Sequence, residues 1–166
     1  MNNISIVEFI KKSPKAELHL HIEGTLEPEQ MFLFAKRNNV QTPFKNINEA
    51  KEAYNFNNLE SFLKIYYEGA KVLLKENDFF ELTWAYALKC KEDNIVHTEI
   101  FFDPQTHTNR GISFDIIING IYKALKKAEK EFGLSFKIIM CFLRHLSEKE
   151  CFKILDQALL HKDKIF

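Results

Sequence analysis

The chain has 166 residues, of which 46% are hydrophobic and 28% charged. This composition is that of a globular protein and excludes an intrinsically disordered one, and the length predicts one domain spanning residues 1–166. Lysine plus arginine and aspartate plus glutamate both number 23, so the formal net charge is zero, which argues against nucleic acid as the main partner because phosphate binding needs a basic surface.

The first half of the chain is predicted to contain one strand among several helices. Pro14 ends the first helix because proline lacks an amide donor, and Thr25 with Pro28 marks the start of the second. Residues 16–22 alternate with the period of a strand. The predicted elements are a helix at 4–12, a strand at 16–22, a helix within 25–39, a loop at 40–57, and helices at 58–75 and 78–93, the last opened by Asn77 or Asp78.

The second half alternates strands with helices. The run "IVHTEIFFDP" (95–104) is rich in β-branched and aromatic residues and ends at a proline, which favours a strand. The other predicted elements are a helix at 113–132 closed by Gly133, a strand at 135–143, a helix at 147–161 and the beginning of a fourth strand at "DKIF" (163–166). This order predicts a parallel α/β sheet, whose functional sites lie beyond the carboxyl ends of the strands.

A histidine pair lies in the stretch "PKAELHLHIEG" (14–24). Residues two apart in a strand share a face, so His19 and His21 point the same way, roughly 6–7 Å apart. Two imidazoles at that spacing reach one metal ion, and zinc commonly uses histidine. The same alternation predicts Glu17 and Glu23 on the histidine face and Leu18, Leu20 and Ile22 under the helices. A surface strand with polar residues outward produces the same pattern, so the motif alone leaves both interpretations open.

Cysteine usage and hydropathy bear on location. Cys90, Cys141 and Cys151 are an odd number with no close spacing, which favours a reducing, cytoplasmic setting. The start of the chain has no apolar run of signal-peptide length, and no stretch approaches the roughly 18 apolar residues that span a bilayer. We therefore expect a cytoplasmic protein with no membrane partner.

Three segments carry a family resemblance. "PKAELHLHIEGTLEPE" resembles the opening motif of the adenosine/adenine deaminase family of the amidohydrolase superfamily. "EIFFDPQTHTNRGI" (99–112) is similar to the family's second-strand segment, and "CFLRHL" (141–146) to its third-strand segment. The Asp-Pro-Gln and Thr-His-Thr forms are closer to the adenine deaminase branch than to the adenosine one.

The resemblance implies a fold, a cofactor and a reaction. It implies the N-terminal part of a (β/α)8 TIM barrel with one Zn²⁺ per intact enzyme, held in part by His19 and His21. The metal lowers the pKa of a water, so that hydroxide attacks C6 of a small-molecule 6-aminopurine and ammonia leaves. Glu23 is implied to lie near the substrate, and Phe62 and Tyr66 to line the cover of the pocket. From its position at the end of the second strand, Gln105 is placed toward the site face, where contact with substrate and capping of a helix or turn both stay open.

The same resemblance predicts what this segment lacks. A (β/α)8 barrel has about 250 residues, and only three complete strands are predicted here. The family's third zinc histidine, proton-shuttling glutamate, further histidine and metal-binding aspartate belong to the second half, so no catalytic residue is assigned in this chain. We expect a chain truncated before the barrel closes, inactive alone, with self-association covering its open strand edges.

Two alternatives stay open at this stage. The first is the N-terminal portion of a purine deaminase, with adenine favoured and adenosine next. The second is a non-catalytic truncated product or interaction protein without a complete metal site. The remaining histidines are expected to have ordinary surface or packing roles; they are His97, with its face turned inward, His107 in a loop, His145 and His161.

Overall fold

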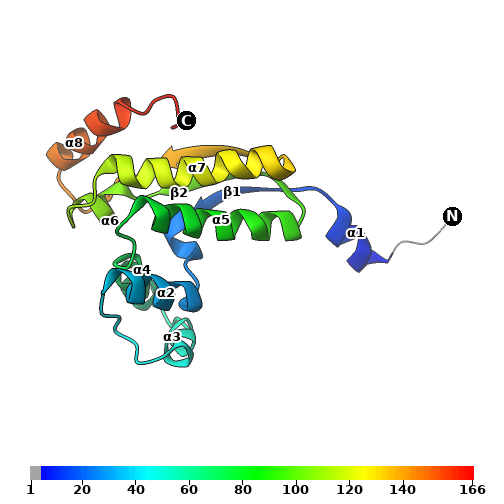
Figure 1. Ribbon diagram of the computed structural model, residues 1–166, viewed down its shortest axis with the longest axis horizontal. Helices are drawn as coiled ribbons and strands as arrows, with labels where there is room; N and C mark the ends of the chain where they lie inside the picture. Colours follow the sequence, from blue (N-terminus) through cyan, green and yellow to red (C-terminus); the bar gives the residue numbers. More distant parts are fainter. Residues whose placement is uncertain (1–4) are drawn as a thin grey trace.

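The computed structural model describes residues 5–166, and their elements follow the predicted order closely (Figure 1). Residue 4, predicted to start the first helix, lies outside the described residues. The elements are α1 (Ile6–Lys12), β1 (Lys15–His21), the 3₁₀ helix η1 (Ile22–Thr25), α2 (Pro28–Asn38), α3 (Ile47–Ala53), α4 (Leu59–Ala70), α5 (Glu76–Glu92), β2 (Ile95–Phe102), α6 (Pro104–Thr108), α7 (Phe114–Phe132), β3 (Ser135–Met140) and α8 (Glu148–Leu159).

The strands of the described residues form one parallel sheet in the order β1-β2-β3. The β2–β3 ladder runs without a break from His97 opposite Ser135 to Phe102 opposite Met140. Helices α5 and α7 lie side by side along the sheet (Figure 1). The predicted parallel α/β arrangement is confirmed, and because the strands are parallel their carboxyl ends meet at one edge.

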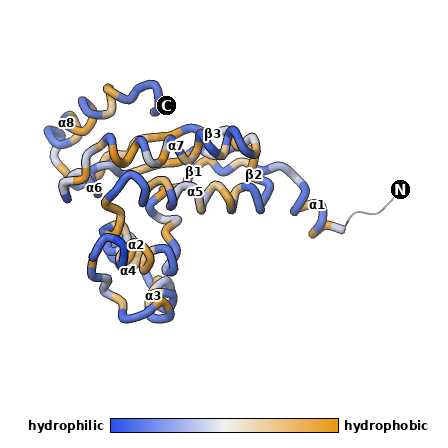
Figure 2. The backbone as a smooth tube through the Cα atoms, viewed as in Figure 1, coloured by the Kyte–Doolittle hydropathy of each residue, from blue (hydrophilic) through white to orange (hydrophobic). Residues whose placement is uncertain are grey.

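The core lies between the sheet and the α5–α7 pair. Ile100 and Phe102 of β2, Phe79 of α5 and Ile117 of α7 are fully buried. Hydrophobic and hydrophilic stretches alternate along α7 (Figure 2), as expected of a helix with one face on a sheet. Burying each of these side chains contributes roughly 1.5–3 kcal/mol. Within residues 5–166 no helix is both long and apolar enough to cross a membrane.

A glycine sets the close approach of α5 and α7. A Cβ on Gly120 of α7 would lie 2.5 Å from the carbonyl oxygen of Glu76 and 2.6 Å from Cβ of Phe79. Both atoms belong to or adjoin the backbone of α5, so a flexible side chain cannot move aside. Any side chain at this position therefore forces the two helices apart.

Gly120→Ala is expected to lower the free energy of unfolding by about 1–3 kcal/mol, the usual range for overpacking. This outweighs the gain of about 1 kcal/mol that alanine brings over glycine inside a helix. Urea unfolding of the two proteins measures the difference. The matched control is Gly69→Ala in α4, where the new Cβ would meet Cδ2 of Leu26 at 3.6 Å, an ordinary contact. A stabilising effect at both positions would contradict the close approach at Gly120.

Several predicted boundaries were wrong, including the ends of α4, which stops at Ala70 and not at 75, and of β3, which stops at Met140 and not at 143. The predicted loop at 40–57 contains α3, whose polar sequence hides a helix that buries Ala50 and is capped by Asn46. Pro104 does not merely end β2; it occupies the first turn of α6, where proline fits because its missing N–H has no helical partner. The fourth strand predicted at 163–166 is not formed, although the amide of Phe166 donates to the carbonyl of Ile138 at 2.8 Å.

A β-bulge in β1 overturns part of the predicted alternation. Between Glu17 and Leu20, β1 advances three residues while β2 advances two. Glu17 and Leu20 therefore share a face, and the hydroxyl of Tyr86 in α5 donates to Glu17 Oε2 at 2.6 Å. The predictions that Glu17 shares the histidine face and that Leu18 is buried are both wrong; Leu18 is 56% exposed. The extra residue resets the two-residue period of the strand.

Candidate metal and substrate site

A cavity of about 630 Å³ opens at the carboxyl ends of the strands. This volume falls within the range of about 300–1,000 Å³ that small-molecule pockets occupy. The lining comes from β1, from the end of β2, from α4 and from the segment that follows β3. It includes His19, His21, Phe62, Tyr66, Asp103 and Cys141.

The two histidines lie side by side on the cavity wall. Their ring centroids are 5.8 Å apart, and both rings stack on Phe101 of β2, at 4.5 Å for His19 and 5.4 Å for His21. The predicted common face at the carboxyl end of β1 is therefore confirmed. Phe101 supplies an apolar surface that fixes both ring planes. Metal binding by the pair stays a prediction.

Asp103 lies next to His21 at the junction of β2 and α6. Its Oδ2 is 3.3 Å from Nδ1 of His21 and accepts a hydrogen bond from the hydroxyl of Tyr66 at 2.7 Å. The hydrogen bond to Asp103 raises the pKa of His21. Burial opposes ionisation of Asp103, but the hydrogen bonds from His21 and Tyr66 lower its pKa. Asp103 is therefore a carboxylate in direct contact with one predicted metal ligand.

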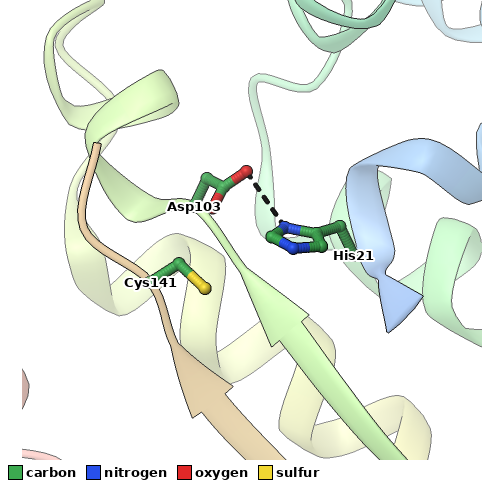
Figure 3. A group of neighbouring side chains, drawn as sticks. All are labelled: His21, Asp103 and Cys141. Atoms are coloured by element: carbon green, nitrogen blue, oxygen red, sulfur yellow. Dashed lines mark hydrogen bonds and ion pairs between the residues drawn. The ribbon is translucent and has the colours of Figure 1, made fainter. Parts of the chain in front are cut away.

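Cys141 completes a group with His21 and Asp103 (Figure 3). The three side chains come from the ends of the three strands, and their potential ligand atoms lie within 4.8 Å of one another. Burial, together with the charges of Asp103 and Glu23, raises the pKa of the Cys141 thiol to about 11. Sequence reasoning used Cys141 only as one of three cysteines without close spacing; its place directly after β3 was the available signal.

Glu23 is buried beneath the cavity and accepts hydrogen bonds from two donors. Oε1 accepts from the amide of Asp103 at 2.9 Å and faces Nε2 of His107 at 3.1 Å, whereas Oε2 lies 3.2 Å from the hydroxyl oxygen of Tyr66, whose one proton is donated to Asp103. The side chains of Glu23 and His107 are both fully buried. Glu23 thus ties η1 to the start of α6, and it does not line the cavity.

His107 is the least expected member of this group. It was predicted to be an ordinary loop residue, but it lies inside α6 and is fully buried. Arg110 Nη2 lies 2.9 Å from Nδ1 of His107. Because a guanidinium only donates, Nδ1 must accept, so the proton is on Nε2 and is donated to Glu23. A run of polar residues after a strand hid this helix, and nothing local in the sequence marks His107 as buried.

The other predicted site residues divide between lining and support. Phe62 and Tyr66 line the cavity, as predicted for its cover. Gln105 is buried outside the lining: its Oε1 accepts from the amide of Leu143 at 2.9 Å, and its Nε2 donates to the carbonyl of Glu150 at 3.3 Å. Contact of Glu23 and Gln105 with a substrate stays a prediction.

The remaining histidines have different surroundings. His97 Nδ1 pairs with Ser135 Oγ at 2.7 Å, and His161 Nε2 pairs with Asp115 Oδ1 at 2.6 Å. His145 lines the cavity from the segment after β3. Neither His97 nor His161 lines this cavity, and the ordinary roles predicted for all three stay predictions.

Comparison with known proteins places this geometry in a family. The family model described as adenosine deaminase matches residues 14–166. Adenine deaminase of Wolinella succinogenes is 62% identical over 97% of the chain and 49% of its own length. Adenine deaminase of Acinetobacter baylyi is 60% identical over 95% of the chain and 48% of its own length. The chain therefore spans about half the length of the curated relatives it matches.

Solved structures agree. A crystal structure of adenine deaminase from Arthrobacter aurescens has a TM-score of 0.88 and 44% identity, covering 92% of this chain and 46% of that one. A zinc-bound amidohydrolase from Burkholderia ambifaria has a TM-score of 0.82 over 98% of this chain and 46% of that one, and its 20% identity supports the fold alone. The predicted fold class, the N-terminal part of a (β/α)8 barrel, is confirmed. The chain belongs to the adenosine deaminase family.

Proposed function

We propose that this chain forms the N-terminal half of a zinc-dependent adenine deaminase. The whole enzyme hydrolyses adenine to hypoxanthine and ammonia. The observation that carries the proposal is the His19–His21 pair, which faces a cavity of about 630 Å³, large enough for a purine, at the carboxyl edge of the sheet. Relatives named adenine deaminase at 54–62% identity favour adenine over adenosine as the substrate.

The residues present fit a zinc ion. Imidazole nitrogen is a common zinc ligand in catalytic sites, and two imidazoles face one cavity here. Within residues 5–166, the hydrogen bond to a His21 ring nitrogen is at Nδ1, which leaves Nε2 for a metal. When bound, zinc supplies Lewis acidity that brings the pKa of a water near neutrality. Phe62 and Tyr66 are proposed to cover the flat face of the purine.

We further propose that the 166-residue chain is inactive alone. A catalytic zinc site has three protein ligands, whereas this proposal assigns two, and the chain spans about half of its relatives. Large apolar side chains remain uncovered, including Phe152 at 57% and Leu160 at 80% exposure, which supports self-association. Three free cysteines support the proposed cytoplasmic location.

Equilibrium dialysis against zinc tests the metal assignment. His19→Ala and His21→Ala are each expected to weaken zinc binding by at least about 10–100-fold. Loss of a residue that only orients a metal ligand has an effect of that size, and loss of the ligand itself should cost no less. His97→Ala is the matched control, since His97 lies on β2 away from the cavity and pairs with Ser135. Unchanged zinc affinity in both cavity variants would overturn the assignment.

An adenine absorbance assay on the same samples tests the proposed inactivity. No turnover is expected with or without added zinc. Zinc-dependent turnover that disappears in His19→Ala would contradict inactivity of the chain, while supporting the assignment of the histidine to the metal.

A further inference from the structure

The hydrogen bonds around Asp103 determine which nitrogen of His21 carries the proton. A neutral histidine binds a metal only through the nitrogen that lacks a hydrogen, and a partner at one nitrogen decides which one that is. Asp103 Oδ2 lies 3.3 Å from Nδ1 of His21. A carboxylate only accepts, so Nδ1 must be the donor. The proton then lies on Nδ1, and Nε2 keeps its lone pair.

Asp103 is itself held from two directions. The hydroxyl of Tyr66 donates to the same Oδ2 at 2.7 Å, and the amide of Asp103 donates to buried Glu23 at 2.9 Å. If Nδ1 of His21 were an acceptor, a proton would have to lie between it and Oδ2 of Asp103. The Tyr66 hydroxyl cannot provide that proton, because it already points its own proton at the same Oδ2. The carboxylate is therefore fixed in place and has no proton to offer to Nδ1.

The support extends through the buried base of the cavity. Glu23 faces His107, and His107 Nδ1 accepts from Arg110. Arg110 also donates to the carbonyls of Ala70 at 3.0 Å and Leu73 at 3.3 Å, at and just beyond the end of α4, the helix that carries Tyr66. The chain of hydrogen bonds thus connects β1, η1, α4 and α6. A displacement of any of these elements would move Asp103 relative to His21.

We propose that Asp103 is a positioning residue, which holds His21 as its Nδ1–H tautomer so that Nε2 is presented to a divalent cation in the cavity. The role of the cation rests on the proposed function, whereas the tautomer does not. Carboxylates that orient metal-binding histidines typically contribute 10–100-fold to metal affinity. Asp103 would act through His21 and need not touch the metal or the purine.

A competing arrangement uses the same side chains differently. His21, Asp103 and Cys141 form a group whose ligand atoms lie within 4.8 Å of one another, so Asp103 and Cys141 would there be direct ligands. In that arrangement Nδ1 of His21, the ring nitrogen that faces Asp103, would bind the metal, and Cys141 would bind it as a thiolate. Our proposal requires neither, and the two arrangements predict opposite tautomers.

Nitrogen NMR of the chain labelled with 15N-histidine reads the tautomer without any metal. Long-range proton–nitrogen spectra at a mildly alkaline pH are expected to show His21 with its proton on Nδ1, and His21→Gln identifies its signals. In Asp103→Ala, His21 is expected to shift toward the Nε2–H form, while the signals of His97 and His161 stay in place as internal controls. A wild-type His21 with its proton on Nε2 would overturn the proposal, even if Asp103→Ala failed to fold.

Metal affinity provides the second measurement, made by competition with a chromogenic zinc chelator. Asp103→Ala is expected to weaken zinc binding about 10–100-fold, and Cys141→Ser is expected to leave it unchanged. An equal loss in Cys141→Ser, or a sulfur-to-cobalt charge-transfer band in the cobalt-loaded chain, would favour the competing arrangement and overturn ours. A wild-type chain with the Nδ1–H tautomer but no zinc affinity would contradict the proposed function and leave the tautomer assignment standing.

Discussion

Asp78→Ala is expected to lower the free energy of unfolding by about 3 kcal/mol, the low end of the range for removing one partner of a buried ion pair, because Arg37 is 30% exposed and keeps its ion pair with Glu81. The Asp78 side chain is fully buried at the start of α5. Its Oδ1 pairs with Arg37, and its Oδ2 accepts from Asn38 Nδ2 at 2.7 Å and from the amides of Leu74 at 2.9 Å and Lys75 at 2.8 Å. One carboxylate thus joins the end of α2 to the start of α5.

Asp78→Asn is expected to be destabilising as well. Every partner of Asp78 is a hydrogen-bond donor. In Asp78→Asn an NH₂ group replaces one carboxylate oxygen, and it then faces a guanidinium or a backbone amide, neither of which can accept a hydrogen bond. Urea unfolding at one protein concentration compares the variants, with Asp156→Asn on the exposed face of α8 as the control expected to be neutral. If Asp78→Asn matches the wild type, the four-donor description of this carboxylate is wrong.

For Asp78, the sequence predicted the helix that carries the residue but not the partners of its side chain. Periodicity and turn residues predicted this helix, but placed its start at Asn77 or Asp78, whereas it begins at Glu76 with Asp78 in its third position. An acidic residue near a helix start interacts favourably with the helix dipole at any of these positions. Its long-range partners, Arg37 and Asn38, are about 40 positions away and leave no local signal.

In the candidate site, too, some features were predictable from local sequence and others depend on long-range contacts. His19 and His21 were predictable, because a two-residue spacing survives in a strand that ends at the site. The β-bulge between Glu17 and Leu20, which includes His19, was not predictable, since it depends on pairing with β2. The contacts of Glu23 with Asp103 and His107 join residues 80 and 84 positions apart. Such contacts follow from the tertiary fold, and local propensity does not encode them.

Glu23→Ala is expected to be the most damaging change at the site. It leaves two buried donors, the amide of Asp103 and Nε2–H of His107, without an acceptor. At about 1–3 kcal/mol for each unsatisfied buried donor, the loss is about 2–6 kcal/mol. Thermal and urea unfolding measure it. A loss below that range would mean that water or a rearranged side chain replaces the carboxylate.

Glu23→Gln separates the structural role of Glu23 from its predicted contact with substrate. Unlike Asp78, Glu23 has one neighbour that can accept a hydrogen bond: the Tyr66 hydroxyl donates its proton to Asp103, and its oxygen can accept from an amide NH₂ at position 23. The amide oxygen then keeps the amide of Asp103 and Nε2–H of His107. We therefore expect Glu23→Gln to unfold close to the wild type, in contrast to Asp78→Asn. If Glu23→Gln destabilised the chain as much as Glu23→Ala, the Tyr66 hydroxyl would be unable to accept from the new amide.

Adenine binding is the second measurement, made by equilibrium dialysis with labelled adenine. If Glu23→Gln kept its stability but bound adenine more weakly, Glu23 would have to reach the purine as a carboxylate. Unchanged binding would confine Glu23 to supporting Asp103 and α6 from beneath the cavity.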